Sequence, residues 1–465
     1  MIFRFALPAF AAALPLVFTA CQTTSGGSDT VAALPVAWRN AADFPTAAPE
    51  RDLARWWTTF GDPVMTRVIG GALHGSPDLA SAAARVREAR AQRKAQASVL
   101  FPTVEASAGR RNGWTDVDGG PDQNTRAYSA GLDASWDADL FGGNRQSVAA
   151  ATAAAESAQE DYYSAQASLA AETALAYLDL RTAEARLTVL RESLKSREET
   201  TKLAEWRATA GEIDTLELRQ AQTSLQQARA AIPSLEQSSV QSRNRLTLLS
   251  GMAPGALDAT LAGGGRGVPH PPRRLAVGIP ADTIRRRPDV RSAGYRWVAA
   301  VARTRSAEAD RLPSLRLSGS LGIDSLSASK FFNPQIASAN VIAGLTGPIF
   351  NAGRIRAQIE AQGAAQELAL QSYQSAVLTA LSEVENALIS CRRSAERMTA
   401  LEQAATSARE ADKLARLRYG TGDSDMLTVL ETQRTSLAIE ESLVGIRSEH
   451  AAAHIRLYKA LGGGW

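Results

Sequence analysis

Along residues 128–140 apolar and polar side chains alternate strictly, so that even positions are apolar and odd positions are acidic or small. A period of two residues is the pattern of a β-strand with one apolar face. Weaker alternating segments lie at residues 104–108, 315–323 and 341–349. The chain is therefore expected to form two β-hairpins, at about residues 102–140 and 314–349, with a polar loop over residues 109–126 in the first.

A different pattern follows each predicted hairpin. The segment 146–210 contains neither Pro nor Gly, and as a helix it would be about 100 Å long at 1.5 Å per residue. Apolar residues recur in steps of four and three in this segment, and in steps of seven near the end of the chain: Ala176, Leu180, Ala183, Leu187, Leu190 and Leu194, and Leu430, Leu437, Val444, Ala451 and Tyr458. This spacing is typical of coiled-coil seams. Turns near Gly211 and Gly422 are expected to fold the rods into two antiparallel helical hairpins, over residues 143–250 and 353–461.

Three landmarks occur twice in the same order. The segment 140–145 (LFGGNR) resembles 349–354 (IFNAGR) at an offset of 209 (354 − 145), and Gly211 with Gly422 and Gly251 with Gly462 each lie 211 apart. A duplicated unit explains this spacing, and two copies are too few for a solenoid. We therefore predict one pseudo-symmetric protomer, with a first copy over residues 62–252 and a second over residues 281–462.

The remaining segments connect these elements. Residues 38–62 are interpreted as a loop, and a helix is expected from Pro63 to Val99. The Gly- and Pro-rich residues 253–280 are interpreted as an irregular connection between the copies. A second helix is expected to run to Leu312, with Asp289 as a candidate N-cap.

The N-terminus carries an export signal. Arg4 is followed by an apolar stretch over residues 5–18, which is too short for a transmembrane helix, and then by Thr19, Ala20 and Cys21. This pattern resembles a bacterial lipoprotein signal, with residues 1–20 as signal peptide, a covalent lipid on Cys21 and a tether and loop over residues 21–61. An ordinary cleavable signal with an incidental cysteine is the alternative. Gln22 after the cysteine favours the outer membrane, by the same resemblance.

The predicted strands have the length that a membrane-spanning strand needs, about ten residues. Four strands cannot close a barrel, and open sheet edges are not tolerated in lipid, so several protomers would have to share one barrel. The alternative is an edge hairpin of a soluble sheet.

Composition excludes several other functions. The formal charge of +3 is too small to indicate nucleic-acid binding. If Cys21 is acylated, Cys391 is the only thiol of the mature chain and no intramolecular disulfide can form. Cys391 is interpreted as a small packed residue. His450 and His454 have a metal-compatible spacing without a third partner, and we interpret them as a packed or solvated helix pair. Since no nucleophile elbow, phosphate loop or dinucleotide motif occurs, we predict no enzyme, no metal site and no cofactor besides the lipid.

Seven motifs in order resemble the TolC-like outer membrane factor family, and within it the lipoprotein branch that serves tripartite RND-type efflux pumps. They are residues 57–63 (WTTFGDP), 139–143 (DLFGG), 279–282 (IPAD), 286–291 (RRPDVR), 347–354 (GPIFNAGR), 383–388 (EVENAL) and 457–465 (LYKALGGGW). The resemblance covers the chain from about residue 38 to its end.

The resemblance implies a mainly α-helical protein with a membrane β part. Three identical protomers would share a twelve-stranded β-barrel in the outer membrane, continued by a twelve-helix α-barrel through the periplasm. The implied partners are two further copies of the chain, a periplasmic adaptor, a proton-driven inner-membrane transporter and outer membrane lipid.

Site residues follow from the resemblance as well. The periplasmic tip, which would contact the adaptor, comprises Gly211, Glu212, Gly420, Gly422 and Asp423. The residues matching the pore constriction are Glu217, Tyr419, Thr428 and Glu431. Thr428 stands where relatives often carry an acidic residue, and Ser424 stands where some carry a basic gate residue. A solvated helix face is the alternative interpretation of Glu217 and Glu431.

The function implied is that of the exit duct of a tripartite efflux pump, which passively conducts small toxic compounds across the outer membrane. Two alternatives are the exit channel of a type I protein secretion system and an envelope lipoprotein that forms no channel. The substrate cannot be read from the chain, because in such pumps selection lies mainly in the inner-membrane transporter.

Overall fold

The computed structural model describes residues 35–41, 51–115, 123–263, 265, 267–272, 280–326 and 337–465. The predicted signal segment and Cys21 lie outside the described residues.

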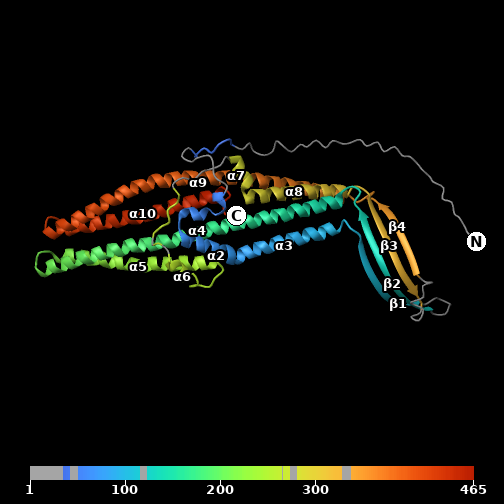
Figure 1. Cartoon of the computed structure of the whole chain (residues 1–465), viewed down its shortest axis with the longest axis horizontal. Coiled ribbons are helices and arrows are strands. Elements are labelled where there is room, and N and C mark those ends of the chain that lie inside the picture. The colour runs from blue at the N-terminus through green and yellow to red at the C-terminus, as the bar shows by residue number, and fades with distance from the viewer. Residues whose placement is uncertain are drawn as a thin grey trace, which may run out of the picture. The chain divides into compact units, whose positions relative to one another are not determined.

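Two helical hairpins form most of the molecule. The first comprises α4 (Gly143–Thr209) and α5 (Thr215–Leu249), and the second comprises α9 (Arg354–Thr421) and α10 (Met426–Ala460). Figure 1 shows the helices of each hairpin side by side, and α10 also packs against α4. The structure thus has helical hairpins where the apolar heptads and the glycine turns predicted them.

The helix predicted from Pro63 to Val99 is wrong in one respect, because it is two helices. The chain forms α2 (Pro63–Gly75) and α3 (Pro77–Ser98), separated by Ser76 in an extended conformation. Pro77 lacks the N–H that a continuous helix would need, so the first helix ends before it. The predicted loop before Pro63 also contains structure: α1 (Arg51–Ala54) and the 3₁₀ helix η1 (Trp56–Phe60).

The connection between the copies is less irregular than predicted. It contains α6 (Asp258–Ala262), and α7 (Pro280–Arg286) and α8 (Pro288–Ala309) follow it. The prediction that Asp289 is the N-cap is wrong, because Arg287 occupies the N-cap position and Pro288 begins the helix. The Asp289 carboxylate instead accepts hydrogen bonds from Val290 N and the Arg287 guanidinium, and α8 ends at Ala309 rather than Leu312.

The duplication is more regular in the structure than in the sequence. The helices α3 and α8 both have 22 residues and begin 211 positions apart (288 − 77), and the N-cap glycines Gly142 and Gly353 are also 211 apart. The sequence offset of 209, taken from Arg145 and Arg354, is therefore two residues short (211 − 209). The reason is that Phe141 directly precedes the capping glycine in the first copy, whereas Asn351 and Ala352 separate Phe350 from the capping glycine in the second.

Four antiparallel strands form one sheet in the order β1-β2-β3-β4. They are β1 (Thr103–Thr115), β2 (Gln123–Ala138), β3 (Ser314–Ser325) and β4 (Ala337–Thr346), and Figure 1 shows them at the end of α3 and α8. Leu132 lies opposite Leu321, and Ala138 lies opposite Leu315. The predicted loop over residues 109–126 was too long, because both strands extend well into it.

The main core lies where η1, α2, α4, α9, α10 and the C-terminal residues meet. Trp56 is fully buried and stacks on Tyr458, with ring centroids 5.4 Å apart. Many of the other core positions are alanine, which lets long helices approach closely. Within the described ranges, no helix combines the length and the apolar composition needed to cross a membrane.

Candidate functional site

The first candidate site is formed by the turns of the two helical hairpins. In the first turn Gly211 has φ +78°, and Glu212 N donates to Arg207 O at 2.9 Å. In the second turn Gly422 has φ +85°, and Asp423 N donates to Arg418 O at 2.8 Å. A positive φ of this kind costs a residue with a Cβ about 1–2 kcal/mol, which explains a glycine at both turns.

The remaining predicted tip residue differs from these two. Gly420 lies within the last turn of α9, exposed, with open space around the position that a Cβ would take. It lies two residues before Gly422 of the second turn. Its backbone, however, does not require glycine.

An arginine joins the two hairpins near their turns. Arg207, in the last turn of α4, donates through Nη1 to the carbonyl oxygen of Tyr419 at 2.8 Å, and its guanidinium lies 4.9 Å from the centre of the Tyr419 ring. The same guanidinium forms an ion pair with Glu212 at 3.1 Å. Arg207 therefore links the first turn to the last turn of α9.

Tyr419 is buried in a small apolar cluster behind the turns. The cluster consists of Ala204, Ala221, Ala415, Tyr419, Met426 and Val429. The Tyr419 hydroxyl has no hydrogen-bond partner among the described residues. Burial raises the pKa of Tyr419, and the nearby Glu217 carboxylate raises it further against the opposing effect of Arg207. Within the protomer, Tyr419 is thus a packing residue between helices rather than a surface residue.

The other predicted constriction residues lie near the starts of α5 and α10, Glu217 and Thr428 in the first turns and Glu431 in the second turn of α10. Glu217 is half-buried near Tyr419, and Thr428 is exposed, with its backbone N donating to the N-cap carboxylate of Asp425 at 2.8 Å. Glu431 is exposed and accepts from Arg434 through both oxygens, at 2.8 and 3.1 Å. Hydrogen bonds from Arg434 lower the pKa of Glu431, so its charge is partly balanced by its own helix.

A groove of about 690 Å³ runs between α5 and α10 next to these residues. The exposed Leu216 and Leu427 line it near the turns, and they occupy equivalent positions in the two copies (427 − 216 = 211). Arg219, Glu431, Arg434 and Glu441 also line the groove. It therefore offers a mixed apolar and charged surface.

A polar layer interrupts the seams farther from the turns. The buried Arg197 donates to Ser224 O at 3.2 Å, and burial lowers the pKa of its guanidinium. Gln433 of α10 donates to Ser196 and Thr200 of α4 at 3.1 and 3.0 Å. These bonds connect α4 to both α5 and α10.

The histidine pair is packed between α9 and α10. The rings of His450 and His454 are 4.6 Å apart, His450 Nδ1 lies 2.8 Å from Ser394 Oγ, and His454 Nδ1 lies 3.7 Å from Cys391 Sγ. Burial, and then the proximity of His454, lowers the pKa of His450 to about 4, while burial raises that of Cys391 to about 12. In the part of the chain that the structure describes, no group of three or more His, Cys, Asp or Glu residues could hold a metal ion.

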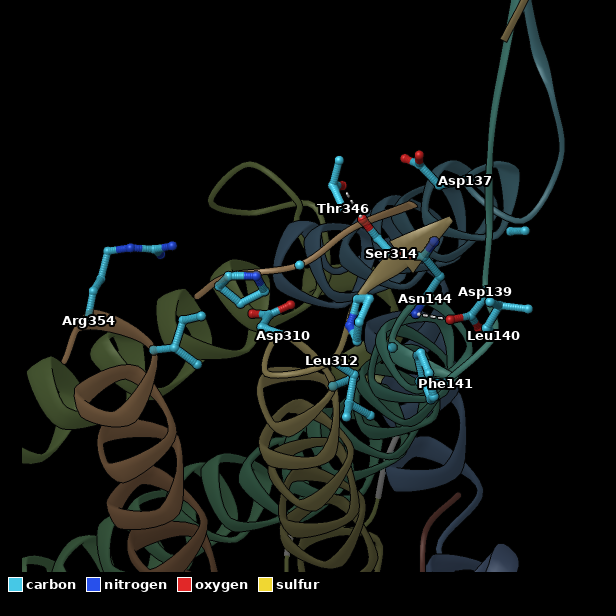
Figure 2. A pocket seen from close by; sticks show the side chains of 17 residues that line it. Asp137, Asp139, Leu140, Phe141, Asn144, Asp310, Leu312, Ser314, Thr346 and Arg354 are labelled. Atoms are coloured by element: carbon cyan, nitrogen blue, oxygen red, sulfur yellow. Dashed lines mark hydrogen bonds between the residues drawn. The ribbon is translucent and has the colours of Figure 1, made fainter. Parts of the chain in front are cut away.

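The second candidate site is a cavity of about 520 Å³ where the strands join the helices. Figure 2 shows Asp139 directed at the backbone of Asn144, and its carboxylate also accepts from Arg145 N at 2.9 Å and Arg145 Nε at 3.1 Å. Burial alone would raise the pKa of Asp139, but these hydrogen bonds together hold it below its usual value. Asp139 thereby fixes the start of α4 relative to the end of β2.

Sequence reasoning missed Arg207, Arg434 and Arg197. A weak signal for Arg207 exists, because a cation is favourable in the last turn of a helix. No local signal shows that its guanidinium reaches Tyr419, which is 212 residues away.

Comparison with known proteins agrees with this geometry. The family model described as outer membrane efflux protein matches residues 68–252 and 279–463. The pyoverdine export outer membrane protein OpmQ of Pseudomonas aeruginosa is 32% identical over 462 residues, which cover 97% of this chain and 95% of the relative. The probable outer membrane lipoprotein SilC of Salmonella typhimurium is 28% identical over 418 residues and covers 88% of each chain.

Among solved structures, the outer-membrane channel OprN superposes with a TM-score of 0.87 at 31% identity, covering 93% of this chain and 97% of that one. The two matched segments of the family model fall on the two structural copies. The chain belongs to the outer membrane efflux protein family of TolC-like channels, and it is an outer membrane efflux channel rather than an enzyme.

Proposed function

We propose that the chain is the exit duct of a tripartite efflux pump that discharges small toxic compounds, and that it acts as a homotrimer. The observation that carries this proposal is the arrangement of each copy, which has a strand hairpin at one end of its helices and a glycine turn at the other. Three protomers would supply twelve strands and close the sheet edges that β1 and β4 leave open.

In this proposal the two turns form the periplasmic tip. The turns themselves, with Glu212 and Asp423 beside the two glycines, provide the surface for a helical hairpin of a periplasmic adaptor. A proton-driven inner-membrane transporter completes the pump. The pyoverdine export role in the name of OpmQ supports small-molecule export over protein secretion.

The tip is also the proposed gate. Arg207 holds the two hairpins of one protomer together through Tyr419, and this link stabilises the closed state. Glu217 and Glu431 would face the axis of the trimer and favour cations, and Arg434 weakens the contribution of Glu431.

A lipid on Cys21 is proposed to add a second attachment to the outer membrane, in line with the lipoprotein named SilC. Each CH₂ of an acyl chain contributes about 0.8 kcal/mol when buried in the bilayer, so two or more chains anchor a protein firmly.

Conductance and export together test the proposal. The purified chain in a planar bilayer should produce discrete ion-conducting steps, and a strain lacking its own exit duct should regain resistance to a small toxic compound when it expresses the chain with a matching adaptor and transporter. A non-channel lipoprotein would give no steps. A protein-secretion duct would conduct but would restore export of a secreted protein instead.

A further inference from the structure

The strand register separates the charges of the sheet by face. Residues directly opposite each other on neighbouring strands point to the same face. All four carboxylates of β1 to β4 fall on one face: Glu105, Asp133, Asp137 and Asp324. Glu105 lies opposite Asp133, and Asp137 lies opposite Arg316, with their charged atoms 4.0 Å apart. We call this the acidic face.

The other face is apolar over most of its length. Its exposed members include Val104, Leu132, Leu321, Val341 and Leu345, which are between 48% and 88% exposed in the protomer. We call it the apolar face. In a channel that spans the outer membrane, this is the face that meets lipid.

Two arginines nevertheless lie on the apolar face. Arg110 is directly opposite Tyr128, and Arg126 is directly opposite Asn112, so all four share the face of Val104 and Leu132. Both arginines are exposed. Because every carboxylate of the four strands lies on the acidic face, neither arginine has an acidic neighbour on its own face of these strands.

Their position along the strands is at the far end from the helices. Tyr128 is ten residues from the end of β2 at Ala138 (138 − 128), which corresponds to about 33 Å of strand. With the usual tilt of a membrane strand this is about 25 Å of depth, the height of the apolar band of an outer membrane barrel. Trp136 lies at the near end of the same face, so aromatic residues mark both edges of the band, as in an aromatic girdle.

Depth also decides what the arginines can do there. Arginine on a lipid-facing surface costs about 2–4 kcal/mol at the midplane of the bilayer but close to nothing at its edge. At the outer edge the phosphates of lipid headgroups are counter-charges that arginine binds through paired N–H groups.

Two local contacts hold the Arg110 side chain and leave part of its guanidinium free to bind a phosphate. Its guanidinium lies 5.6 Å from the centre of the Tyr128 ring, and its Nε donates to Asn112 Oδ1 at 3.3 Å. The terminal nitrogens remain available for an anion. Arg126 is a diagonal neighbour across the strand pair, at a separation of about 7–8 Å, so the two side chains can reach one diphosphorylated headgroup or two adjacent ones.

We propose that Arg110 and Arg126 form a binding site for phosphorylated lipid of the outer leaflet. This inference rests on the proposed function, because it takes the sheet to span the outer membrane. The ligand is a phosphate-bearing glycolipid such as lipid A, and the site fixes the depth of the first hairpin in the membrane.

The test uses the full chain, purified and delipidated in a neutral detergent. Binding of bis-phosphorylated lipid A and of the same lipid without phosphates is measured by native mass spectrometry. The double variant R110Q/R126Q is compared with R111Q, a matched control in which the neighbouring arginine on the acidic face is changed.

The wild-type chain and R111Q should bind the phosphorylated lipid at least about tenfold more tightly than the dephosphorylated one, and R110Q/R126Q should lose this preference. That factor corresponds to roughly one charge-assisted hydrogen bond. The double lysine variant R110K/R126K should retain part of the preference for the phosphorylated lipid. The proposal is overturned by an equal preference in R110Q/R126Q, by no preference in the wild type, or by equal competition from inorganic phosphate at the lipid's concentration.

Conductance in a planar bilayer separates this inference from the proposed function. Channels that conduct in the wild type and in R110Q/R126Q, without any phosphate preference in the wild type, would remove the lipid site alone. A chain that neither inserts nor conducts would remove the proposed function, and the lipid site with it.

Discussion

The Arg207 guanidinium and the Tyr419 backbone are joined by a hydrogen bond of 2.8 Å, and the same guanidinium lies over the Tyr419 ring at 4.9 Å. Arg207 belongs to the first copy of the duplicated unit and Tyr419 to the second. This contact therefore links the two helical hairpins immediately behind their turns. An opening motion that separates the hairpins at the tip must break it.

Replacing Arg207 with alanine is expected to favour the open state of the tip. A hydrogen bond from a charged group contributes about 1.5–3 kcal/mol, so its loss would raise the ratio of open to closed channels by about ten- to a hundredfold if the contact is present only when closed. The open fraction in planar bilayers measures this ratio directly.

The control for this experiment is Arg191→Ala. Arg191 also lies on α4, but its ion pair with Glu236 at 2.9 Å is exposed and stays within one hairpin. Exposed pairs of this kind contribute little, so the control should behave as the wild type. An unchanged open fraction in Arg207→Ala would show that the contact does not hold the gate.

The contact between Arg207 and Tyr419 also shows where sequence reasoning ends. Local patterns predicted the strands, the heptads and the two glycine turns, because each depends on residues close together in the chain. The burial of Tyr419 and the reach of Arg207 depend on how two hairpins 211 residues apart pack against each other. Periodic patterns in the sequence around Arg207 or Tyr419 show which face of a helix is apolar, but they do not show which distant helix packs against it.

Two errors near helix starts have a related cause. Asp289 is a good N-cap residue by type, yet Pro288 can occupy the first position of a helix, which moves the cap to Arg287. In the first copy, Pro77 has the same effect. The helix α2 ends before it, and α3 begins with it. In both copies the proline determined the boundary more strongly than the polar residue after it.

Gly422→Val is expected to destabilise the second turn by about 1–2 kcal/mol, because valine is strained at φ +85°. A Cβ at this position would lie 3.5 Å from Arg207 Nη2, an ordinary van der Waals distance, so the expected cost comes from the backbone conformation. Efflux should fall and the thermal midpoint should decrease. Gly363→Val is a matched control on the same helix, since Gly363 has no positive φ and no atom within 4 Å of the added Cβ. Equal effects of the two substitutions would contradict the backbone argument.

Substitutions of Glu431 and Arg434 are expected to change ion selectivity in opposite directions. Glu431→Gln should reduce the preference for cations, whereas Arg434→Gln should increase it, because Arg434 balances the Glu431 carboxylate through two hydrogen bonds. Reversal potentials in a salt gradient measure both. Arg447→Gln, farther along α10 and paired with Glu402 at 3.2 Å, is the control. If neither residue changes the reversal potential, the solvated-face interpretation of Glu431 is correct.

The buried histidine pair should make the stability of the helices depend on pH. The pKa of His450 is lowered from 6.5 to about 4, so below pH 6.5 the unfolded chain takes up a proton more readily than the folded chain. The free energy of unfolding should therefore be constant with respect to His450 above pH 6.5 and should fall as the pH decreases towards 4. Denaturant unfolding at several pH values should show a smaller decrease for His450→Gln. A decrease of the same size in the variant would assign the pH dependence to other groups.

Thiol labelling tests the packing of Cys391 and the lipid on Cys21 in one experiment. Cys391 is buried and its pKa is raised to about 12, so it should react with a maleimide at a negligible rate in the native protein at neutral pH, because the thiolate is the reactive form. In denaturant it should react fully. If the sulfur of Cys21 carries a lipid, denatured protein from the outer membrane should contain one reactive thiol per chain, and Cys391→Ala should contain none. Two reactive thiols in the denatured wild type would rule out acylation of the Cys21 sulfur, and rapid labelling of the native protein would rule out the packed position of Cys391.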